Sequence, residues 1–408
     1  MRHPASKGIV CVAANTTWYV YNFRRRLIAE LVEQGYEVVA LSPADRYVQF
    51  LQKLGIRHVD LSLDNGSTNP FREAASLLSM FVALRKAKPT VLLTYTPKIN
   101  IYGSIAARML GVPAIANLSG LGRAFVAGGW LKFVTKRLYG VALKQPSVIF
   151  FQNEEDRKVL VGAGLVDPAR AKRLPGSGVD LERFRPVACS RDTGQFVFLL
   201  AGRLLWDKGV GEFVDAARAV KEQFPQAEFR LLGFVDVQNP SAVSRAQVDQ
   251  WDAGGVVRYL GATDDVRPHY AAADCVVLPS YYREGVPRTL LEAASMGIPI
   301  ITTDSAGCRD TVEDGVTGLL VRPRDPIDLA SKMGKMLCLT QDDRRLMGER
   351  GRSKMCREFD ERIVIEHYLS AISEIRRDAK VMRHRRGNPN AYPIETSKTV
   401  ESSDPWKE

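Results

Sequence analysis

The chain has 408 residues, of which 45% are hydrophobic and 25% are charged, and its formal net charge is +11. This size and balance suit two or three folded domains and exclude a wholly disordered protein. The sequence has no run of about 18 apolar residues, no C-x-x-C pair among its six cysteines and no metal-type spacing among its five histidines. We therefore expect no membrane-spanning helix, no disulfide framework, no bound metal and no cofactor, and reduced thiols as in a cytoplasmic protein.

Short apolar segments alternate with helical patterns through the first half of the chain. We expect strands at residues 8–14, 36–41, 90–95, 114–118 and 147–151, and helices near 22–34, 71–87, 99–110 and 129–144. This alternation predicts a parallel sheet that is covered by helices on both faces.

The second half repeats the alternation without repeating the sequence. Between the halves, Gly176, Gly178 and two prolines within residues 174–186 predict a hinge. The expected strands are 196–202, 228–233, 256–261, 275–280 and 298–303, and two helices follow residue 340. The predicted fold class is α/β, with two Rossmann-like domains whose parallel sheets face each other across a cleft. The expected segments are 1–180, 181–358, a helix at 359–380 and a polar, disordered tail at 381–408.

Two glutamates in the second half suggest a ligand site. Glu284 precedes Gly285 and Pro287, so we expect it in a loop, whereas Glu292 lies in a helical pattern that ends at Gly297. The two carboxylates would flank a helix N-terminus, which favours an anion because its backbone N–H groups are free. The arrangement suits an extended ligand with hydroxyl groups at both ends and an anion between them, as in a nucleotide sugar.

A basic loop in the same half complements these carboxylates. The segment LLAGRLLWDKG, residues 199–209, leads from a strand through Gly202 into a loop that carries Arg203 and Lys208. Two cations on one loop suit a diphosphate, because charge-assisted hydrogen bonds are the stronger kind. They could also stabilise that diphosphate as it leaves the sugar.

The motifs GRLLWDKG, YLGATDD and LPSYYREGVPRTLLEA together resemble the retaining, nucleotide-sugar-dependent glycosyltransferases of family 4, which have the GT-B fold. The resemblance covers about residues 8–375 and is greatest for a branch that adds N-acetylgalactosamine in α1,3 linkage to an undecaprenyl-diphosphate-linked sugar. The segments that resemble this branch are YNFRR (21–25), STNPF (67–71), GLGRAF (120–125), GSGVDLERF (176–184) and AGC (306–308). The resemblance also implies that the last helix crosses back to the first domain.

The resemblance implies roles for the site residues. Glu284 would orient the hexose, Arg203 and Lys208 would neutralise the diphosphate, and Glu292 would accept hydrogen bonds from the ribose. The leaving phosphate oxygen would take the acceptor proton on the face it leaves, which retains configuration without a protein nucleophile or a metal. The other expected donor-binding residues are Gly202, Leu260, Gly285, Val286, Pro287 and Arg288.

The chain departs from the family pattern at two places in the first domain. The first loop has Asn15, Thr16 and Thr17 where many relatives have a glycine pair, and Asn117 and Ser119 stand where many relatives place a histidine. The sequence therefore does not identify a general base.

Basic charge is concentrated in the first half. Residues 74–153 contain ten Lys or Arg residues and no Asp or Glu, which favours an anionic partner, either a nucleic acid or a membrane. Aromatic and basic residues alternate at 128–146, as in an interfacial helix, although an ordinary helix packed on its sheet fits nearly as well. The expected acceptor or membrane contacts are Arg24, Arg25, Lys98, Arg123, Trp130, Lys132, Lys136 and Arg137.

The leading hypothesis is a peripheral enzyme on the inner face of the cell membrane. Its partners would be a nucleotide sugar, a polyprenyl-diphosphate-linked acceptor and an anionic membrane surface, with no nucleic acid. A UDP-sugar 2-epimerase of the same architecture is one alternative, and a basic nucleic-acid-binding protein is another. Neither alternative needs the basic, acid-free stretch together with two glutamates beside a diphosphate loop.

Overall fold

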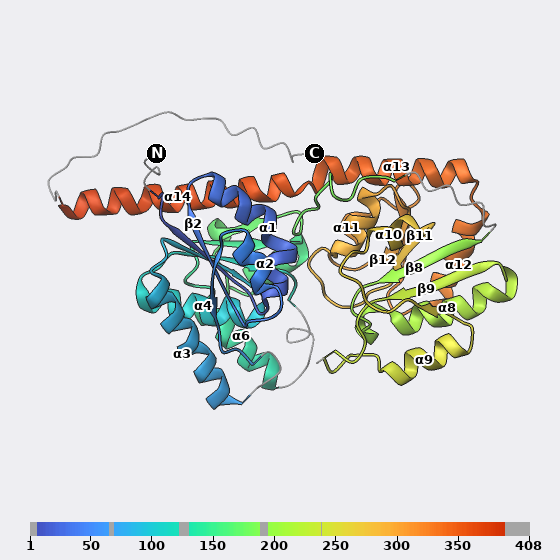
Figure 1. Cartoon of the computed structure of the whole chain (residues 1–408), viewed down its shortest axis with the longest axis horizontal. Coiled ribbons are helices and arrows are strands. Elements are labelled where there is room, and N and C mark those ends of the chain that lie inside the picture. Colours follow the sequence, from blue (N-terminus) through green and yellow to red (C-terminus); the bar gives the residue numbers. More distant parts are fainter. Residues whose placement is uncertain (1–5, 65–68, 122–129, 188–194, 238, 388–408) are drawn as a thin grey trace.

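The computed structural model describes residues 6–64, 69–121, 130–187, 195–237 and 239–387, without the side chains of 130–135 and 382–387. Two domains, each built on a parallel sheet covered by helices, lie side by side along the long axis of the molecule (Figure 1). The predicted fold class is therefore confirmed. Two consecutive helices near the C-terminal end of the described chain run along one side of the molecule, α13 beside the C-terminal domain and α14 beside the N-terminal domain (Figure 1).

The N-terminal sheet has seven strands in the order β3-β2-β1-β4-β5-β6-β7, and every pair is parallel. Five strands match the expected segments, and the two edge strands β3 and β7 are additional. They have four and three residues, too few to show a periodic pattern. The strands are β1 Ile9–Ala13, β2 Glu37–Ser42, β3 Arg57–Asp60, β4 Val91–Tyr95, β5 Ala114–Leu118, β6 Val148–Phe151 and β7 Ala171–Arg173.

Helices cover both faces of this sheet because successive side chains of each strand point to opposite sides. In β1, Val10 and Val12 pack against α1 and α14, whereas Cys11 and Ala13 face the core beneath α3, α4, α6 and α7. The first face carries α1 Thr17–Glu33, α2 Val48–Lys53 and α14 Glu361–Gly387. The second carries α3 Pro70–Ala87, α4 Pro97–Leu110, α6 Trp130–Ala142 and α7 Glu154–Gly162.

The C-terminal sheet has six strands in the order β10-β9-β8-β11-β12-β13, again all parallel. The strand expected at 256–261 is reduced to two paired residues at the sheet edge, and β13 is additional. The strands are β8 Phe196–Ala201, β9 Ala227–Leu232, β10 Arg258–Tyr259, β11 Cys275–Leu278, β12 Ile300–Thr303 and β13 Gly318–Val321. The helices are α8 Val210–Gln223, α9 Arg245–Ala253, α10 Arg267–Ala271, α11 Arg288–Ser295, α12 Pro326–Cys338 and α13 Gln341–Glu358, with 3-10 turns η1 Pro168–Arg170, η2 Trp206–Lys208 and η3 Arg309–Thr311.

Helix α14 returns the chain from the C-terminal domain to the N-terminal domain. At the crossing, the Val179 amide donates to the Phe359 carbonyl at 2.8 Å, and the Glu361 amide donates to the Val179 carbonyl at 3.1 Å. Tyr368 then lies fully buried in the N-terminal core, where its hydroxyl accepts a hydrogen bond from the Asn117 amide at 2.9 Å. The helix continues to Gly387, beyond the expected end at residue 380, and residues 388–408 lie outside the described chain.

Truncating Tyr368 should destabilise the N-terminal domain. We expect Tyr368→Ala to lower the free energy of unfolding by about 3–5 kcal/mol because it leaves a cavity in the core. Tyr368→Phe should cost about 1–2 kcal/mol because it leaves the buried Asn117 amide without its acceptor. Urea unfolding measures both, with the exposed Ser370→Ala on the same helix as the control. Equal stability of the three variants would show that α14 is not part of this core.

Candidate active site

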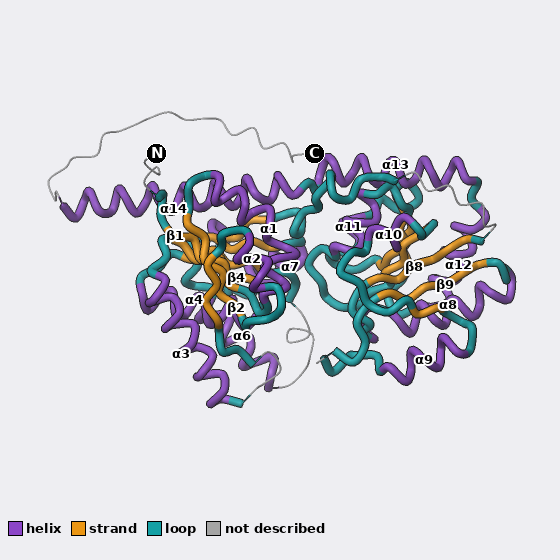
Figure 2. The backbone as a smooth tube through the Cα atoms, in the orientation of Figure 1, coloured by secondary structure: helices purple, strands orange, loops and turns teal. Residues whose placement is uncertain are grey.

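The candidate site lies where the loops after several strands meet between the two domains. In a doubly wound sheet, ligands bind beyond the carboxyl ends of the strands. In the C-terminal domain these loops are 202–208 after β8 and 279–287 after β11, and in the N-terminal domain they are 119–121 after β5 and 152–153 after β6. Figure 2 shows the strands of both domains with loops between the two sheets.

Lys208 and Glu284 form an ion pair at the centre of this region. The Lys208 Nζ lies 2.5 Å from Glu284 Oε2, and the two side chains are 16% and 12% exposed. The Ser280 hydroxyl donates to the other carboxylate oxygen at 2.6 Å. Gly209 makes this approach possible, because its φ is +77° and a Cβ there would lie 2.2 Å from the Pro279 carbonyl oxygen. Two residues that are 76 positions apart in the sequence are thus held in direct contact.

Arg203 provides an exposed cation at the start of the same loop. Its side chain has no hydrogen bond or ion pair with another residue of the described chain. The preceding Gly202 has a φ of +146°, and its carbonyl oxygen would lie 1.6 Å from a Cβ on Gly233. The loops after β8 and β9 therefore cross at two glycines, which fixes the direction in which the chain enters Arg203. The Gly202 amide donates to the Leu232 carbonyl at 2.9 Å and is not free for a ligand.

Glu292 lies on α11 and is paired with a residue of its own helix. The Arg288 Nε donates to Glu292 at 3.0 Å, and the Tyr270 hydroxyl donates to its other oxygen at 3.4 Å. Burial raises the pKa of the Glu292 carboxyl, and the nearby Arg288 and Arg183 guanidinium groups oppose this shift. Arg288 also donates to the Asn22 carbonyl at 3.0 Å and lies over the Phe23 ring, so it connects α11 to α1.

The backbone amides expected to bind a diphosphate are largely used by the protein itself. The Gly285 amide donates to the Ser119 carbonyl at 3.2 Å, and the Val286 amide donates to Gln152 Oε1 at 3.2 Å. Pro287 has no N–H, and the Leu260 amide donates to the Leu231 carbonyl at 2.9 Å. The Gly285 and Val286 amides are thus bonded within the protein in this conformation, and their expected role in phosphate binding stays a prediction. Of the backbone amides expected to donate hydrogen bonds to a phosphate, the Arg288 amide remains as a candidate, at the N-terminus of α11.

Three glycines from distant segments enclose the loop that carries Glu284. A Cβ on Gly120 would lie 2.7 Å from the Arg283 carbonyl oxygen, one on Gly176 would lie 2.7 Å from Val286 Cβ, and one on Gly307 would lie 1.3 Å from the Gly285 carbonyl oxygen. All three have positive φ angles, which glycine adopts without strain. The GLG, GSG and AGC motifs therefore share one structural purpose, which is to let three segments approach residues 283–286.

Side chains after β6 hold the same loop from the N-terminal domain. Gln152 accepts from the Val286 amide and donates to Asn117 Oδ1 at 3.2 Å, which connects the loop to Tyr368 on α14. Asn153 donates to the Glu284 carbonyl at 3.0 Å. Neither residue was predicted from the sequence, although both directly follow a predicted strand, where ligand-site residues are expected.

An ion pair between the domains also holds this loop. Arg283 Nε lies 2.9 Å from Asp156 Oδ1, and Asp156 is fully buried. Burial raises the pKa of the Asp156 carboxyl, while hydrogen bonds from Asn153 and Arg283 lower it. Asp156 was also missed by the sequence analysis, and nothing in its local pattern shows that a cation from the other domain contacts it.

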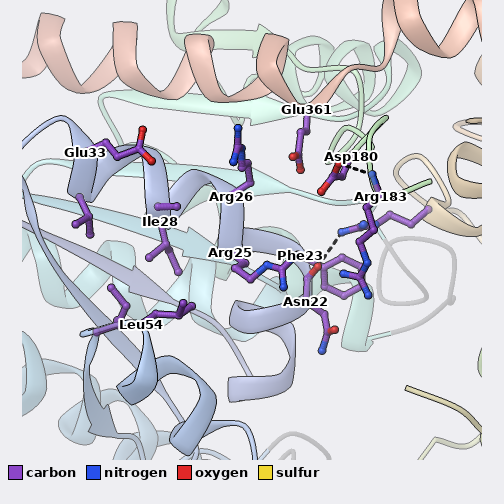
Figure 3. A pocket seen from close by; sticks show the side chains of 14 residues that line it. Asn22, Phe23, Arg25, Arg26, Ile28, Glu33, Leu54, Asp180, Arg183 and Glu361 are labelled. Atoms are coloured by element: carbon purple, nitrogen blue, oxygen red, sulfur yellow. Dashed lines mark hydrogen bonds between the residues drawn. The ribbon is translucent and has the colours of Figure 1, made fainter. Parts of the chain in front are cut away.

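A cavity of about 470 Å³ lies between α1, the linker and α11. Figure 3 shows Arg25 and Arg26 on α1, Asp180 and Arg183 in the linker, and Glu361 at the start of α14 around it. Burial lowers the pKa of the Arg183 guanidinium, and the neighbouring arginines lower it further. Arg25 therefore lines the same cavity as Arg288 of α11. It lies on the opposite face of the N-terminal sheet from α3, α4 and α6.

The expected acceptor and membrane residues do not form one group. Arg24 is 2% exposed, with its guanidinium 4.1 Å from the centre of the Tyr95 ring, so it does not reach the surface, and its expected contact with the acceptor stays a prediction. Lys98 is partly buried and bonds to Glu73 at 2.7 Å and to the Asp64 carbonyl at 2.8 Å. Lys136 and Arg137 are exposed on α6. Arg123 lies outside the described residues, as do the side chains of Trp130 and Lys132.

Within the described chain, no group of three or more His, Cys, Asp or Glu side chains is arranged to hold a metal ion. The charged groups expected at the ligand site are Arg203, the Lys208–Glu284 pair and the Arg288–Glu292 pair, and of these Arg288 lines the cavity of about 470 Å³. Such a set can neutralise an anion with fixed cations while carboxylates accept hydrogen bonds from hydroxyl groups.

Comparisons with known proteins agree with this fold. Residues 22–176 match the family described as "Glycosyl transferase 4-like domain", and residues 195–338 match "Glycosyl transferases group 1". The chain is thus a glycosyltransferase with the GT-B fold. It belongs to the glycosyltransferases in which a 4-like N-terminal domain precedes a group 1 C-terminal domain.

Two curated relatives match over most of their length. The chain is 27% identical over 372 residues to the N,N'-diacetylbacillosaminyl-diphospho-undecaprenol alpha-1,3-N-acetylgalactosaminyltransferase of Campylobacter jejuni, covering 87% of this chain and 96% of that protein. It is 28% identical over 302 residues to the UDP-Gal:alpha-D-GlcNAc-diphosphoundecaprenol alpha-1,3-galactosyltransferase of Escherichia coli, covering 71% of this chain and 76% of that protein.

Solved structures share the fold at lower identity. A glycosyltransferase from Rickettsia africae superposes with a TM-score of 0.72 at 18% identity, covering 91% of this chain and 99% of that one. The HepE protein of Anabaena in complex with UDP-glucose superposes with a TM-score of 0.70 at 17% identity, covering 92% of this chain and 100% of that one.

Breaking the central ion pair should lower turnover strongly without unfolding the protein. We expect Lys208→Ala and Glu284→Gln each to lower kcat by about 10²–10³-fold, because each removes a preorganised group from the place where charge develops. Steady-state kinetics with circular dichroism as a folding check measures this. The exposed Lys335→Ala on α12 is the control, and normal kcat in either site variant would defeat the assignment.

Donor binding should depend on pH through Glu292. Burial raises the pKa of the Glu292 carboxyl, so the protonated form contributes most to the stability of the folded protein. This contribution to the free energy of unfolding is lost as pH rises through the raised pKa. Ribose hydroxyls donate to the ionised form, so UDP affinity should fall as pH decreases through the same range. Calorimetry of UDP binding should show this loss in the wild type and a flat profile in Glu292→Gln. A pH response shared by both proteins would exclude Glu292 as its source.

Proposed function

We propose that the enzyme transfers an N-acetylhexosamine from a UDP-sugar to a polyprenyl-diphosphate-linked saccharide, with retention of configuration, during assembly of a bacterial surface polysaccharide or glycan. The observation that carries this proposal is the contact between Lys208 and Glu284, on a loop that also carries the exposed Arg203. This contact would join a hydroxyl-binding carboxylate to a diphosphate-binding cation. The two long relatives support the choice of acceptor, since their names describe transfer to undecaprenyl-diphosphate-linked sugars.

The residues fit successive parts of a donor that lies across the C-terminal domain. Glu292 would accept from the ribose hydroxyls, and Arg203 with Lys208 would hold the diphosphate. Glu284 would orient the hexose hydroxyls and stabilise the positive character that develops at the anomeric carbon. Lys208 contacts Glu284 directly, so it would be shared between that carboxylate and the leaving phosphate.

The acceptor hydroxyl would lose its proton to the leaving phosphate oxygen. The new bond then forms on the face from which the diphosphate departs, which retains the configuration. Arg203 and Lys208 supply the neutralising charge that a divalent ion provides in other transferases, so we propose that no metal is required. Asn117 is buried and bonded to Tyr368 and Gln152, so it is a positioning residue in this proposal, and no general base is assigned.

We further propose that the enzyme binds peripherally to the inner face of the cell membrane, where a lipid-linked acceptor would be held. Support comes from the basic stretch without Asp or Glu at 74–153 and from exposed Lys136 and Arg137 on α6. Among the helices described, none is both long and apolar enough to span a bilayer.

The decisive experiment supplies a panel of UDP- and GDP-sugars together with a short-chain prenyl-diphosphate-linked N-acetylhexosamine. We expect one UDP-N-acetylhexosamine to yield a disaccharide lipid and an equal amount of UDP, detected by mass spectrometry, with an α-linkage by NMR. Glu284→Gln serves as the inactive control. Conversion of UDP-N-acetylglucosamine to its epimer without an acceptor would instead establish the epimerase alternative. Specific retention of nucleic acid at physiological salt, without sugar transfer, would establish the nucleic-acid-binding alternative.

A further inference from the structure

The outward side of α3 is apolar over most of the helix. Phe71, Leu78 and Val82 are 86%, 62% and 53% exposed, and Ala74 and Ala75 between them are exposed as well. Residues at these spacings lie along one side of a helix. The opposite side is buried against α4 and the sheet through Ser76, Met80, Ala83, Leu84 and Ala87.

A helix on the surface of a soluble domain normally presents polar residues to water. Helix α3 is apolar on both sides, and it lies at the outer edge of the N-terminal domain, away from the C-terminal domain (Figure 1). No described segment of the chain covers Phe71, Leu78 or Val82, as their exposure shows. Exposed apolar stripes of this kind mark a surface for a partner or a membrane.

The charges around the stripe identify the kind of partner. Arg85, Lys86 and Lys88 are exposed on or directly after the same helix, and the exposed Arg72 is paired with Asp64 at 2.9 Å. The acidic residue of α3, Glu73, is bonded to Lys98 and Tyr102 and is therefore neutralised. On the neighbouring α4, the exposed Arg108 adjoins Met109, which is 64% exposed. The partner must therefore combine negative charge with an apolar interior.

We infer that α3 lies in the headgroup layer of an anionic membrane, with Phe71, Leu78 and Val82 between the acyl chains. Arg85 and Lys86 would contact lipid phosphates at the C-terminal end of the helix. This inference rests on the proposed function, because it brings the cleft to the bilayer that would hold the acceptor. It also makes α3 the principal membrane contact in place of the helix expected at 128–146, which covers the same face of the sheet.

A nucleic acid fits this surface less well than a lipid. Basic residues alone would serve phosphate contacts, whereas side chains such as Leu78 and Val82 would face water on such a partner. Interfacial helices combine both features, since apolar side chains enter the acyl boundary while Lys and Arg reach the headgroups.

The test compares two apolar sites of similar exposure on different domains. Leu78→Glu/Val82→Glu places charge in the stripe, and Ile327→Glu on α12 is the matched control because Ile327 is 80% exposed. We expect the double variant to bind vesicles of phosphatidylcholine and phosphatidylglycerol about tenfold more weakly than the wild type. The control should bind like the wild type, and vesicles of phosphatidylcholine alone should bind weakly in every case.

A second pair of variants tests the charge separately from the apolar stripe. Arg85→Glu/Lys86→Glu should weaken binding at low salt, where headgroup attraction is strong, and differ less from the wild type at high salt. Lys335→Glu on α12 should change neither. Phe71→Ser provides a milder substitution of the stripe, and thermal unfolding shows that each variant is folded.

Three outcomes would overturn the inference. They are unchanged vesicle binding by Leu78→Glu/Val82→Glu, wild-type protein that binds neither kind of vesicle, and conversion of a dimer to a monomer by the same variant in light scattering. The last would show that α3 contacts a second copy of the chain. Sugar transfer to a short, detergent-free acceptor should persist in all α3 variants. If the wild type does not transfer sugar to this acceptor, the proposed function is contradicted. The inference about α3 then depends on the vesicle-binding result alone.

Discussion

The four residues from Arg283 to Val286 are contacted by both domains, and the candidate site depends on these contacts. Ser119, Gln152, Asn153 and Asp156 contact them from the N-terminal domain. Gly307 packs on the same residues from within the C-terminal domain, and Gly176 does so from the linker. The backbone of Glu284 therefore depends on contacts from both domains, whereas its carboxylate is held by Lys208 and Ser280 of its own domain. The domain arrangement is therefore part of the site itself.

Electrostatics explains why the charged residues occur in pairs. Lys208 and Glu284 are both largely removed from solvent, and a single charge in that position would be costly. Arg288 plays the same part for Glu292, and it also reaches α1 through Asn22 and Phe23. A diphosphate that enters this cleft would meet Arg203 together with cations already balanced by carboxylates. We propose that these carboxylates then turn to the hydroxyl groups of the donor.

Much of the fold could be predicted from local patterns. Ten strands follow from runs of apolar residues, and the parallel sheets follow from their alternation with helical patterns. The helices predicted in this way are α1, α3, α4, α6, α11, α13 and α14. The short edge strands β3 and β7 could not be predicted in this way, because a few residues paired with a longer neighbour carry no period of their own. The buried position of Arg24 could have been predicted, since it shares a helix face with Val20, Leu27, Ile28 and Leu31.

The sequence motifs identify the residues of the candidate site, but they do not show which residues of the other domain contact them. Lys208, Glu284 and Glu292 follow from their motifs, whereas the use of the Gly285 and Val286 amides by Ser119 and Gln152 depends on how two domains meet. The same is true of Gly120, Gly176 and Gly307, whose common neighbour is far away in the sequence. The apolar stripe of α3 was overlooked because periodicity alone does not show which side of an apolar helix is buried.

The central claim concerns one pocket, and a crystal structure with a bound UDP-sugar tests it most directly. The account predicts the diphosphate within hydrogen-bond distance of Arg203 and Lys208, the hexose hydroxyls at Glu284 and the ribose at Glu292. A nucleotide found away from residues 202–208 and 284–292 would contradict it.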